Sequence, residues 1–481
     1  MSTEIALAVG TRLPSAGTLA AGAAIALVIV AALVALMRRH HEAFPLLAIF
    51  ALPFRLPIST DGKTVNLLIP LYLVVAAGVL AQLLPRLLAR GRESADAGAA
   101  RPGEPPAAIT ELRFWRTPRG LEWLLLGAVG LYALQGIYSA DHARAGENIA
   151  FFYIPFGLLF VLLREVHWTR ELLLRCLGVM VALAVIFAGV GFVEYARKSL
   201  FLNPKVVTAN EYDNYFRVNS LFFDPNIYGR FLALVMIALT TIVLWSVRRR
   251  DIALGGIALA WLLGGLVTSF SQSSIAALLL GLTILAAWRW DTRATLYAAF
   301  SLVALAGVVV LVAPTSLHFG LKGSSGSTSN ATSGRTKLIS GGLDLFAKRP
   351  LEGYGAGSFE VEYKRHSKGS EASAQNATSA SHTIPVTVAA EQGILGLGLY
   401  IALLVAAFFV LFRGAGRSPP RIAVAACFAA LVLHTWTYAD FLEDPFTWAL
   451  LAIGVALARA GEGTAPATVL SSPALSGHDS R

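Results

Sequence analysis

The chain has 481 residues, of which 56% are hydrophobic and only 14% are charged, and its mean hydropathy is +0.64. Soluble domains carry about 25% charged residues, so this composition excludes an ordinary soluble protein and indicates a polytopic membrane protein. The formal net charge of +10 would also suit a nucleic-acid partner. Basic loops between membrane helices explain most of that charge, so we expect no nucleic acid.

Apolar runs of roughly 15 to 28 residues recur along the chain, and such runs are long enough to cross a hydrocarbon core as helices. We therefore predict an all-α fold, a polytopic membrane helical bundle of about 12–13 transmembrane helices. The candidate spans, in chain order, are residues 16–37, 42–56, 64–86, 120–138, 148–163, 171–194, 222–247, 252–268, 273–288, 294–313, 385–412, 422–438 and 446–458.

Basic residues gather in alternate loops between these spans. The positive-inside rule places such loops in the cytoplasm. They contain residues 38–39, 86–119, 164–170, 248–250, 289–293 and 413–421. The loops that then face outward are residues 57–63, 139–147, 195–221, 314–384 and 439–445. The protein is therefore expected to be a multi-pass membrane chain with membrane lipids around it.

Three segments differ in composition from the apolar spans. Residues 89–117 are rich in Ala, Pro, Gly and charge and are expected to form a flexible cytoplasmic linker, and residues 461–481 a disordered cytoplasmic tail. Residues 1–460, which include this linker and the long outer loop 314–384, are expected to form a single integral membrane domain. Outer loop 314–384 carries an excess of Lys and Arg, which suits an anionic ligand. It also contains an amphipathic pattern, from which we predict a helix on the outer membrane surface through Leu338, Ile339, Gly342, Leu343 and Phe346.

Several signatures of cofactor chemistry are missing from the sequence. The only cysteines, Cys176 and Cys427, fall in apolar spans, which indicates neither disulfides nor a zinc site. No Asp-x-Asp pair and no Gly-x-x-x-x-Gly-Lys-Ser/Thr motif occurs, so neither a metal-dependent nucleotide-sugar transferase nor an ATP-driven protein is indicated. We expect no cofactor and no metal.

A histidine and a carboxylate mark the start of the span at 385–412. His382 precedes Pro385, a first-turn proline, so it would lie at the positive end of a helix dipole that keeps its ring neutral and available as a base. Glu391 lies deeper, where an unpaired carboxylate is costly and must face a partner or a wet cavity. These two residues are the candidate catalytic pair. The alternative is a loop histidine at the interface and a structural hydrogen-bonding glutamate.

Two arginines flank the start of the span at 222–247. Arg217 lies in the preceding outer loop and Arg230 lies in the first turns of the helix, so both guanidinium groups can reach the outer boundary. Arginine binds phosphate in a bidentate manner, which suits a diphosphate ligand. The alternative is contact with lipid headgroups. Asp224, followed by Pro225, is read as a helix cap.

At this point the residues resemble the O-antigen ligase and Wzy-type polymerase superfamily, bacterial membrane glycosyltransferases of the GT-C type. The resemblance is carried by "SHTIPVTVAAEQGILGLG", with its Glu-x-Gly-x-x-Gly, and by "RVNSLFFDPNIYGRFLAL". A third block, "SGRTKLISGGLDLFAKRPLEGYGAGSF", is similar to the family's Gly-Arg, helix and Pro-x-x-Gly-x-Gly segment. Together the three blocks span residues 217–398.

The resemblance implies a glycosyltransferase that moves a glycan from an undecaprenyl-diphosphate carrier to an acceptor hydroxyl outside the membrane, without metal or nucleotide. The acceptor would be a glycan, a lipid or a protein. Arg217, Arg230 and Arg335 would bind the diphosphate, and His382 would orient or deprotonate the hydroxyl. Glu391 would order the helix or neighbouring side chains rather than take part in the reaction. Where the family often carries arginine, this chain has Gln272, which leaves open a differently assembled diphosphate site or a different donor.

Two other classes of function compete with a transferase. A flippase or another transporter for lipid-linked oligosaccharide would also use cationic residues and many helices, but transporters place charges near mid-membrane and are often built from repeats, and no repeat is evident. A non-catalytic membrane partner in envelope synthesis would not require His382.

Overall fold

A computed structural model describes residues 16–60, 63–88, 116–202, 210, 216–290, 292–295, 297, 328–366, 381 and 383–463. Most of the predicted linker 89–117, the tail 461–481 and the predicted span 294–313 lie outside these residues. In chain order the elements are α1 (Ala16–Arg39), α2 (Ala43–Ala51), β1 (Leu56–Thr60), β2 (Lys63–Leu67), α3 (Ile69–Gly78), η1 (Val79–Leu83), α5 (Pro118–Gly136), α6 (His142–Asn148), η3 (Ile149–Tyr153), α7 (Ile154–Arg164), α8 (Arg170–Arg197), α10 (Pro225–Trp245), α11 (Arg249–Thr268), α12 (Gln272–Arg289), α14 (Thr328–Lys348), α15 (Phe359–His366), α17 (Ile384–Phe412), η5 (Ala415–Arg417), α18 (Pro419–Thr437) and α19 (Pro445–Gly463).

The predicted polytopic helical fold is confirmed. In the part of the chain that the structure describes, nine helices are long and apolar enough to cross a membrane. They begin within a few residues of the predicted spans, because caps and prolines set their first turns. At α10, for example, the Asp224 carboxylate accepts a hydrogen bond from the Asn226 amide at 2.6 Å, and Pro225 occupies the first turn, as predicted.

The region of the second and third predicted spans differs from the prediction. The span expected at 42–56 is only the nine-residue helix α2, too short to cross a bilayer. Strands β1 and β2 then form an antiparallel hairpin over residues that were predicted to be helical or loop. The sequence between the strands is Asp-Gly, a dipeptide typical of two-residue hairpin turns, and the strands are rich in β-branched residues. Local turn chemistry therefore overrides the apolar pattern here.

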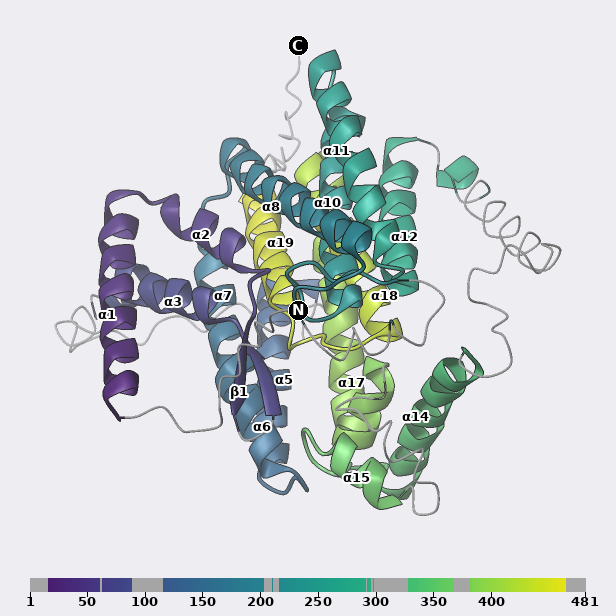
Figure 1. The fold of residues 1–481 in the computed structure, drawn as a ribbon. Coiled ribbons are helices and arrows are strands. Elements are labelled where there is room, and N and C mark those ends of the chain that lie inside the picture. Colours follow the sequence, from purple (N-terminus) through teal and green to yellow (C-terminus); the bar gives the residue numbers. More distant parts are fainter. Residues whose placement is uncertain are drawn as a thin grey trace, which may run out of the picture.

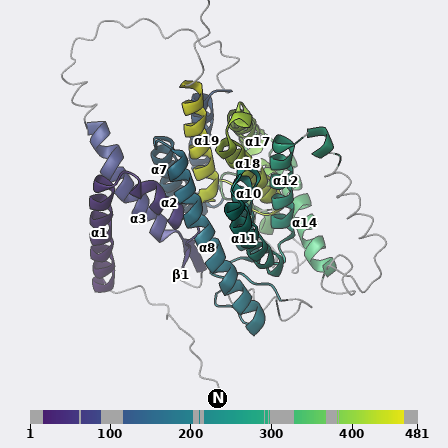
Figure 2. The same cartoon turned by 90° about the horizontal axis from the view of Figure 1, so that it is seen from above.

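The helices pack around two large apolar cores, and a smaller third cluster joins α14 and α15 to Ala390 of α17. One core joins α2, α3, α5, α7 and α19 with the second half of α17, and the other joins α10, α11, α12 and α18 with the second half of α8. In both views α1 and α3 form one flank of the molecule and α12 and α14 the opposite flank, with α17 and α19 between them (Figures 1 and 2). Helix α18 contributes to both cores, so it ties the two halves together.

Helix α14 confirms the amphipathic helix predicted in the long loop, and Leu338 and Gly342 of the expected face are buried, but Leu343 is not. Leu338 and Leu345 are buried, whereas Leu343 is 50% exposed. The helix packs against α17 and α15 rather than standing alone, and the three lie together at the foot of Figure 1. The close approach depends on Gly342, where an added Cβ would lie 2.6 Å from Val386 of α17.

Candidate functional site

The predicted site residues fall on three elements. Arg217 lies in the segment before α10, Arg230 on α10, and Glu391 on α17. Arg335 lies on α14, within a stretch of that helix whose side chains are not described. His382 lies outside the described residues, although its neighbours Ser381 and Thr383 are described. The geometry therefore bears directly on the first three residues only.

The Glu391 carboxylate is 6% exposed and is held by backbone groups. Its Oε2 accepts from the Gly357 amide at 2.9 Å, and its Oε1 accepts from the Phe359 amide at 3.1 Å. Phe359 begins α15, so the carboxylate caps that helix from a neighbouring element. Both carboxylate oxygens therefore accept hydrogen bonds. These two amides are the partners that a buried charge in a membrane helix requires.

The glycine-rich segment 350–358 fits against a kink in α17. Gly393 has φ +64°, a left-handed conformation that interrupts the helix. The carbonyls and amides freed there pair with the segment: the Ile394 amide donates to the Pro350 carbonyl at 2.7 Å, and the Gly355 amide donates to the Glu391 carbonyl at 2.8 Å. The segment therefore forms a docked turn that completes the hydrogen bonds of the broken helix.

Helix α5 and the turn that follows it also form hydrogen bonds with the glycine-rich segment. The Gln135 side chain donates to the carbonyls of Glu352 at 3.3 Å and Gln392 at 3.1 Å, so one amide spans the segment and the kink. The Ser139 hydroxyl donates to the Ala356 carbonyl at 2.7 Å. These bonds make the region around Glu391 a rigid scaffold.

Arg217 is partly buried and is held only by neutral groups. Its Nε donates to the Ser269 carbonyl at 3.2 Å, and its Nη2 donates to the Asn226 side-chain oxygen at 3.3 Å. Asn210 brackets its backbone, accepting from the Arg217 amide and donating to its carbonyl. Among the residues that the structure describes, no carboxylate forms an ion pair with Arg217. Its positive charge is therefore oriented but not neutralised by the described fold.

A network of hydroxyls continues from Arg217 into the bundle. Ser271 donates to the Asn226 side-chain oxygen at 2.9 Å and lies 2.7 Å from the Ser274 hydroxyl. The Nε2 atom of His434, which is fully buried in α18, lies 3.2 Å from both the Ser273 and the Ser274 hydroxyls. The network surrounds the start of α12, whose first residue, Gln272, has an exposed side chain. At the position where arginine was expected from the resemblance, the buried contacts are therefore made by serines.

Arg230 has the opposite environment to Arg217. Its side chain is 2% exposed and forms an ion pair with Asp444, which is 1% exposed. Its Nη1 also donates to the Ala439 carbonyl at 3.5 Å. The guanidinium therefore joins α10 to the turn before α19, and its charge is balanced within the fold. This geometry gives no support to direct binding of a diphosphate by Arg230.

The segment from 438 to 444, which connects α18 to α19, carries the other acidic groups of this region. The Tyr438 hydroxyl hydrogen-bonds to Asp224. Glu443 is partly buried and accepts from the Asn148 amide at 2.9 Å, and Asn148 also donates to the Tyr132 hydroxyl at 2.7 Å. Burial and the nearby Asp440 carboxylate raise the pKa of Glu443 to about 7, while the charges of Arg144 and Arg55 oppose that rise. This carboxyl group can therefore exchange a proton near neutral pH.

Asp444, Glu443 and His434 were not singled out from the sequence. The signal for His434 was present, because a histidine within an apolar span is a functional candidate. Asp444 and Glu443 carry no local signal beyond their charge, because their partners Arg230 and Asn148 are distant in the chain. Only the packed bundle shows that Asp444 neutralises one of the two predicted arginines.

The comparison with known families gives one match. The model of the family described as O-antigen ligase matches residues 257–401, less than half of the chain. The matched segment includes the last part of α11, helices α12, α14 and α15, the glycine-rich turn, and the first part of α17 with Glu391. It also contains Arg335 and His382. Arg217 and Arg230 precede it. No curated protein matches the chain. This segment of the chain is therefore similar to the O-antigen ligase family, and the many membrane-type helices of the described residues agree with that similarity.

Proposed function

We propose that this protein transfers a glycan from an undecaprenyl-diphosphate carrier to an acceptor hydroxyl at the outer side of the cytoplasmic membrane. The family match supports an O-antigen ligase-like activity in general. The observation that carries the finer proposal is the charge on Arg217, which is oriented by Ser269 and Asn226 and has no carboxylate partner in the described part of the chain. A fixed cation without a counterion suits an anionic ligand.

In this proposal Arg217 binds the diphosphate of the donor. Negative charge grows on the diphosphate as the bond between the anomeric carbon and the phosphate oxygen breaks, so a preoriented guanidinium stabilises the transition state more than the ground state. Asn226 and Ser271 hold the guanidinium in place through a shared side-chain oxygen. Arg335 is proposed as a second diphosphate ligand, on the basis of the resemblance alone.

His382 is proposed to orient or deprotonate the acceptor hydroxyl. The oxygen then attacks the anomeric carbon, the diphosphate leaves, and a single displacement inverts the configuration of that carbon. Glu391 is proposed as a positioning residue, because both of its oxygens already bind amides of the glycine-rich turn and α15. It would hold the start of α17, and thereby His382, in place. No metal or nucleotide enters this scheme.

The outward side of the site is proposed from the distribution of basic residues. Arg38 and Arg39 end α1, Arg248 precedes α11, and Arg289 ends α12, so these arginines mark one end of several helices. The positive-inside rule assigns that end to the cytoplasm. Arg217 precedes the start of α10, at the end of that helix opposite to Arg248, and so falls on the outward side.

The test is transfer by the purified protein in liposomes that contain a lipid-linked glycan donor and a soluble acceptor. The proposal predicts a glycosylated product in wild type and loss of product in His382→Ala, without added metal. Arg249→Ala, which removes an exposed side chain in the first turn of α11, is the matched control and should retain activity. Movement of the donor between leaflets with no product formed would favour a transporter instead. Absence of both product and movement would favour a non-catalytic partner.

A further inference from the structure

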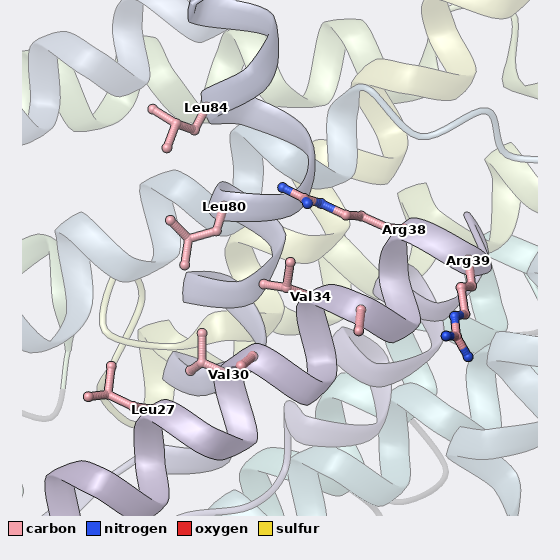
Figure 3. A pocket seen from close by; sticks show the side chains of 9 residues that line it. Leu27, Val30, Val34, Arg38, Arg39, Leu80 and Leu84 are labelled. Carbon is pink, nitrogen blue, oxygen red and sulfur yellow. The ribbon is translucent and has the colours of Figure 1, made fainter.

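An apolar groove separates α1 from the helix that continues α3. It has a volume of about 750 Å³ and is open along one side. Its walls come from α1 on one side and from η1 and the turn after it on the other (Figure 3). The wall residues are Leu27, Val30, Ala31, Val34, Ala35, Leu80 and Leu84. The groove is therefore shaped and lined to take a hydrocarbon chain.

Two arginines close one end of this groove. Arg38 and Arg39 both line it, at the last turn of α1. Figure 3 shows Arg38 extending from α1 toward the helix that carries Leu80 and Leu84, while Arg39 points away from that helix. Within the described ranges neither arginine forms an ion pair, and the nearest acid in sequence, Glu42, pairs with Arg175. Arginines in the last turn of a helix interact favourably with the helix dipole, but this role does not explain why they border a groove.

Among the described residues, the main contacts of helix α1 with the bundle lie along this side. These contacts are with α3, α2 and η1, and Leu27 and Val28 are each 70% exposed. A lipid chain in the groove would fill the space between α1 and its neighbour, and a phosphate at Arg38 would meet an unneutralised charge. Apolar walls that end in free cations complement a ligand with an apolar tail and an anionic head.

We propose that this groove is a binding site for an anionic phospholipid, with an acyl chain between α1 and η1 and the phosphate at Arg38 and Arg39. The positive-inside rule places the site in the cytoplasmic leaflet, on the opposite side from Arg217. The ligand is therefore a structural lipid and not the glycan donor. The inference does not depend on the proposed transferase activity.

The test is retention of dioleoyl phosphatidylglycerol or dioleoyl phosphatidylcholine by the purified full-length protein, measured by native mass spectrometry. Wild type should retain phosphatidylglycerol preferentially. Because each arginine near a membrane surface contributes about fivefold to binding of anionic lipid, Arg38→Gln/Arg39→Gln should lower that retention by at least tenfold. Arg248→Gln/Arg249→Gln, which removes two exposed arginines outside the groove, is the matched control and should change it little.

A second variant tests the groove itself. Val34→Trp fills the space between the walls and leaves both arginines in place, so it should also reduce retention of phosphatidylglycerol. Equal retention of the two lipids by wild type, or equal loss in the control and in the groove variants, would overturn the proposal. Displacement of phosphatidylglycerol by equimolar undecaprenyl diphosphate would assign the groove to the donor instead. A dimer that is lost in Val34→Trp would assign it to a second copy of the chain.

Discussion

Two arginines at the start of α10 carry the same charge in opposite surroundings. Arg230 is buried against Asp444, so the fold supplies its counterion, whereas Arg217 is partly buried and fixed by neutral oxygens of Ser269 and Asn226. The difference teaches how to separate structural from ligand-binding charges in a membrane protein. A structural charge is neutralised by its own chain, because an unpaired buried charge is costly. An oriented charge without a partner in the described fold is a candidate for binding a ligand.

Glu391 resembles Arg230 in its burial and in having both of its charged atoms engaged, although its partners are neutral amides and not a counterion. Its two oxygens accept hydrogen bonds from the Gly357 and Phe359 amides, so its burial is fully compensated. Both buried charges therefore join distant segments of the chain. Substitution of Arg230 or Glu391 should therefore lower the stability of the fold rather than act directly on the transfer reaction.

The largest expected effect is on the ion pair. Asp444→Asn leaves the Arg230 guanidinium buried without a counterion and should destabilise the protein by about 3–5 kcal/mol. The measurement is the unfolding midpoint of purified protein in detergent. Replacing both partners, Arg230→Met with Asp444→Leu, should recover most of that stability, since the buried charge is then absent. Equal destabilisation in the single and double variants would show that the pair does not act as a unit.

The next effect concerns the kink in α17. Gly393→Ala forces a residue with a Cβ to keep φ +64°, and that Cβ would lie 2.2 Å from the Leu351 carbonyl oxygen. This positive-φ backbone conformation is adopted essentially only by glycine and alone costs roughly 1–3 kcal/mol for another residue, so a total loss of about 2 kcal/mol or more is expected. Gly398→Ala is the control in the same helix, because nothing lies within 4 Å of its added Cβ. Similar stabilities for the two variants would contradict the docked-turn geometry.

A smaller effect is expected from Glu391→Gln. The amide can accept only through its oxygen, so one of the Gly357 and Phe359 amides loses its partner at a cost of about 1–3 kcal/mol. Hydrogen exchange at these two amides should accelerate, while exchange in α10 should stay unchanged. Unaltered exchange at Gly357 and Phe359, combined with loss of transfer, would return Glu391 to a direct catalytic role.

The last effect depends on pH. Burial and Asp440 raise the pKa of Glu443 from 4.5 to about 7, so the folded protein holds a proton there that the unfolded chain releases. Stability should therefore fall as the pH rises from about 4.5 to about 7 and then level off. In Glu443→Gln this component should vanish, which would flatten the dependence of the unfolding midpoint on pH. An unchanged dependence would show that other groups determine it.

The sequence predicted the helical architecture well because long apolar runs have few alternatives in a membrane. It also predicted the cap at Asp224, which depends on neighbouring residues alone. The hairpin at residues 56–67 was missed, although its Asp-Gly turn was visible. The environments of Arg217 and Arg230 could not be distinguished in advance, because Asp444 lies on a distant segment. The roles of Arg335 and His382 remain predictions.

The most direct test of the central distinction is binding of undecaprenyl diphosphate to purified protein. Loss of a charged hydrogen-bonding partner should raise the Kd of Arg217→Ala by about 10-fold to 100-fold. The Arg230→Met/Asp444→Leu double variant should bind like wild type, provided that it folds, because the pair it removes is neutral overall. Arg249→Ala should also bind normally. Wild-type affinity in Arg217→Ala, with binding lost in the folded double variant, would contradict the account.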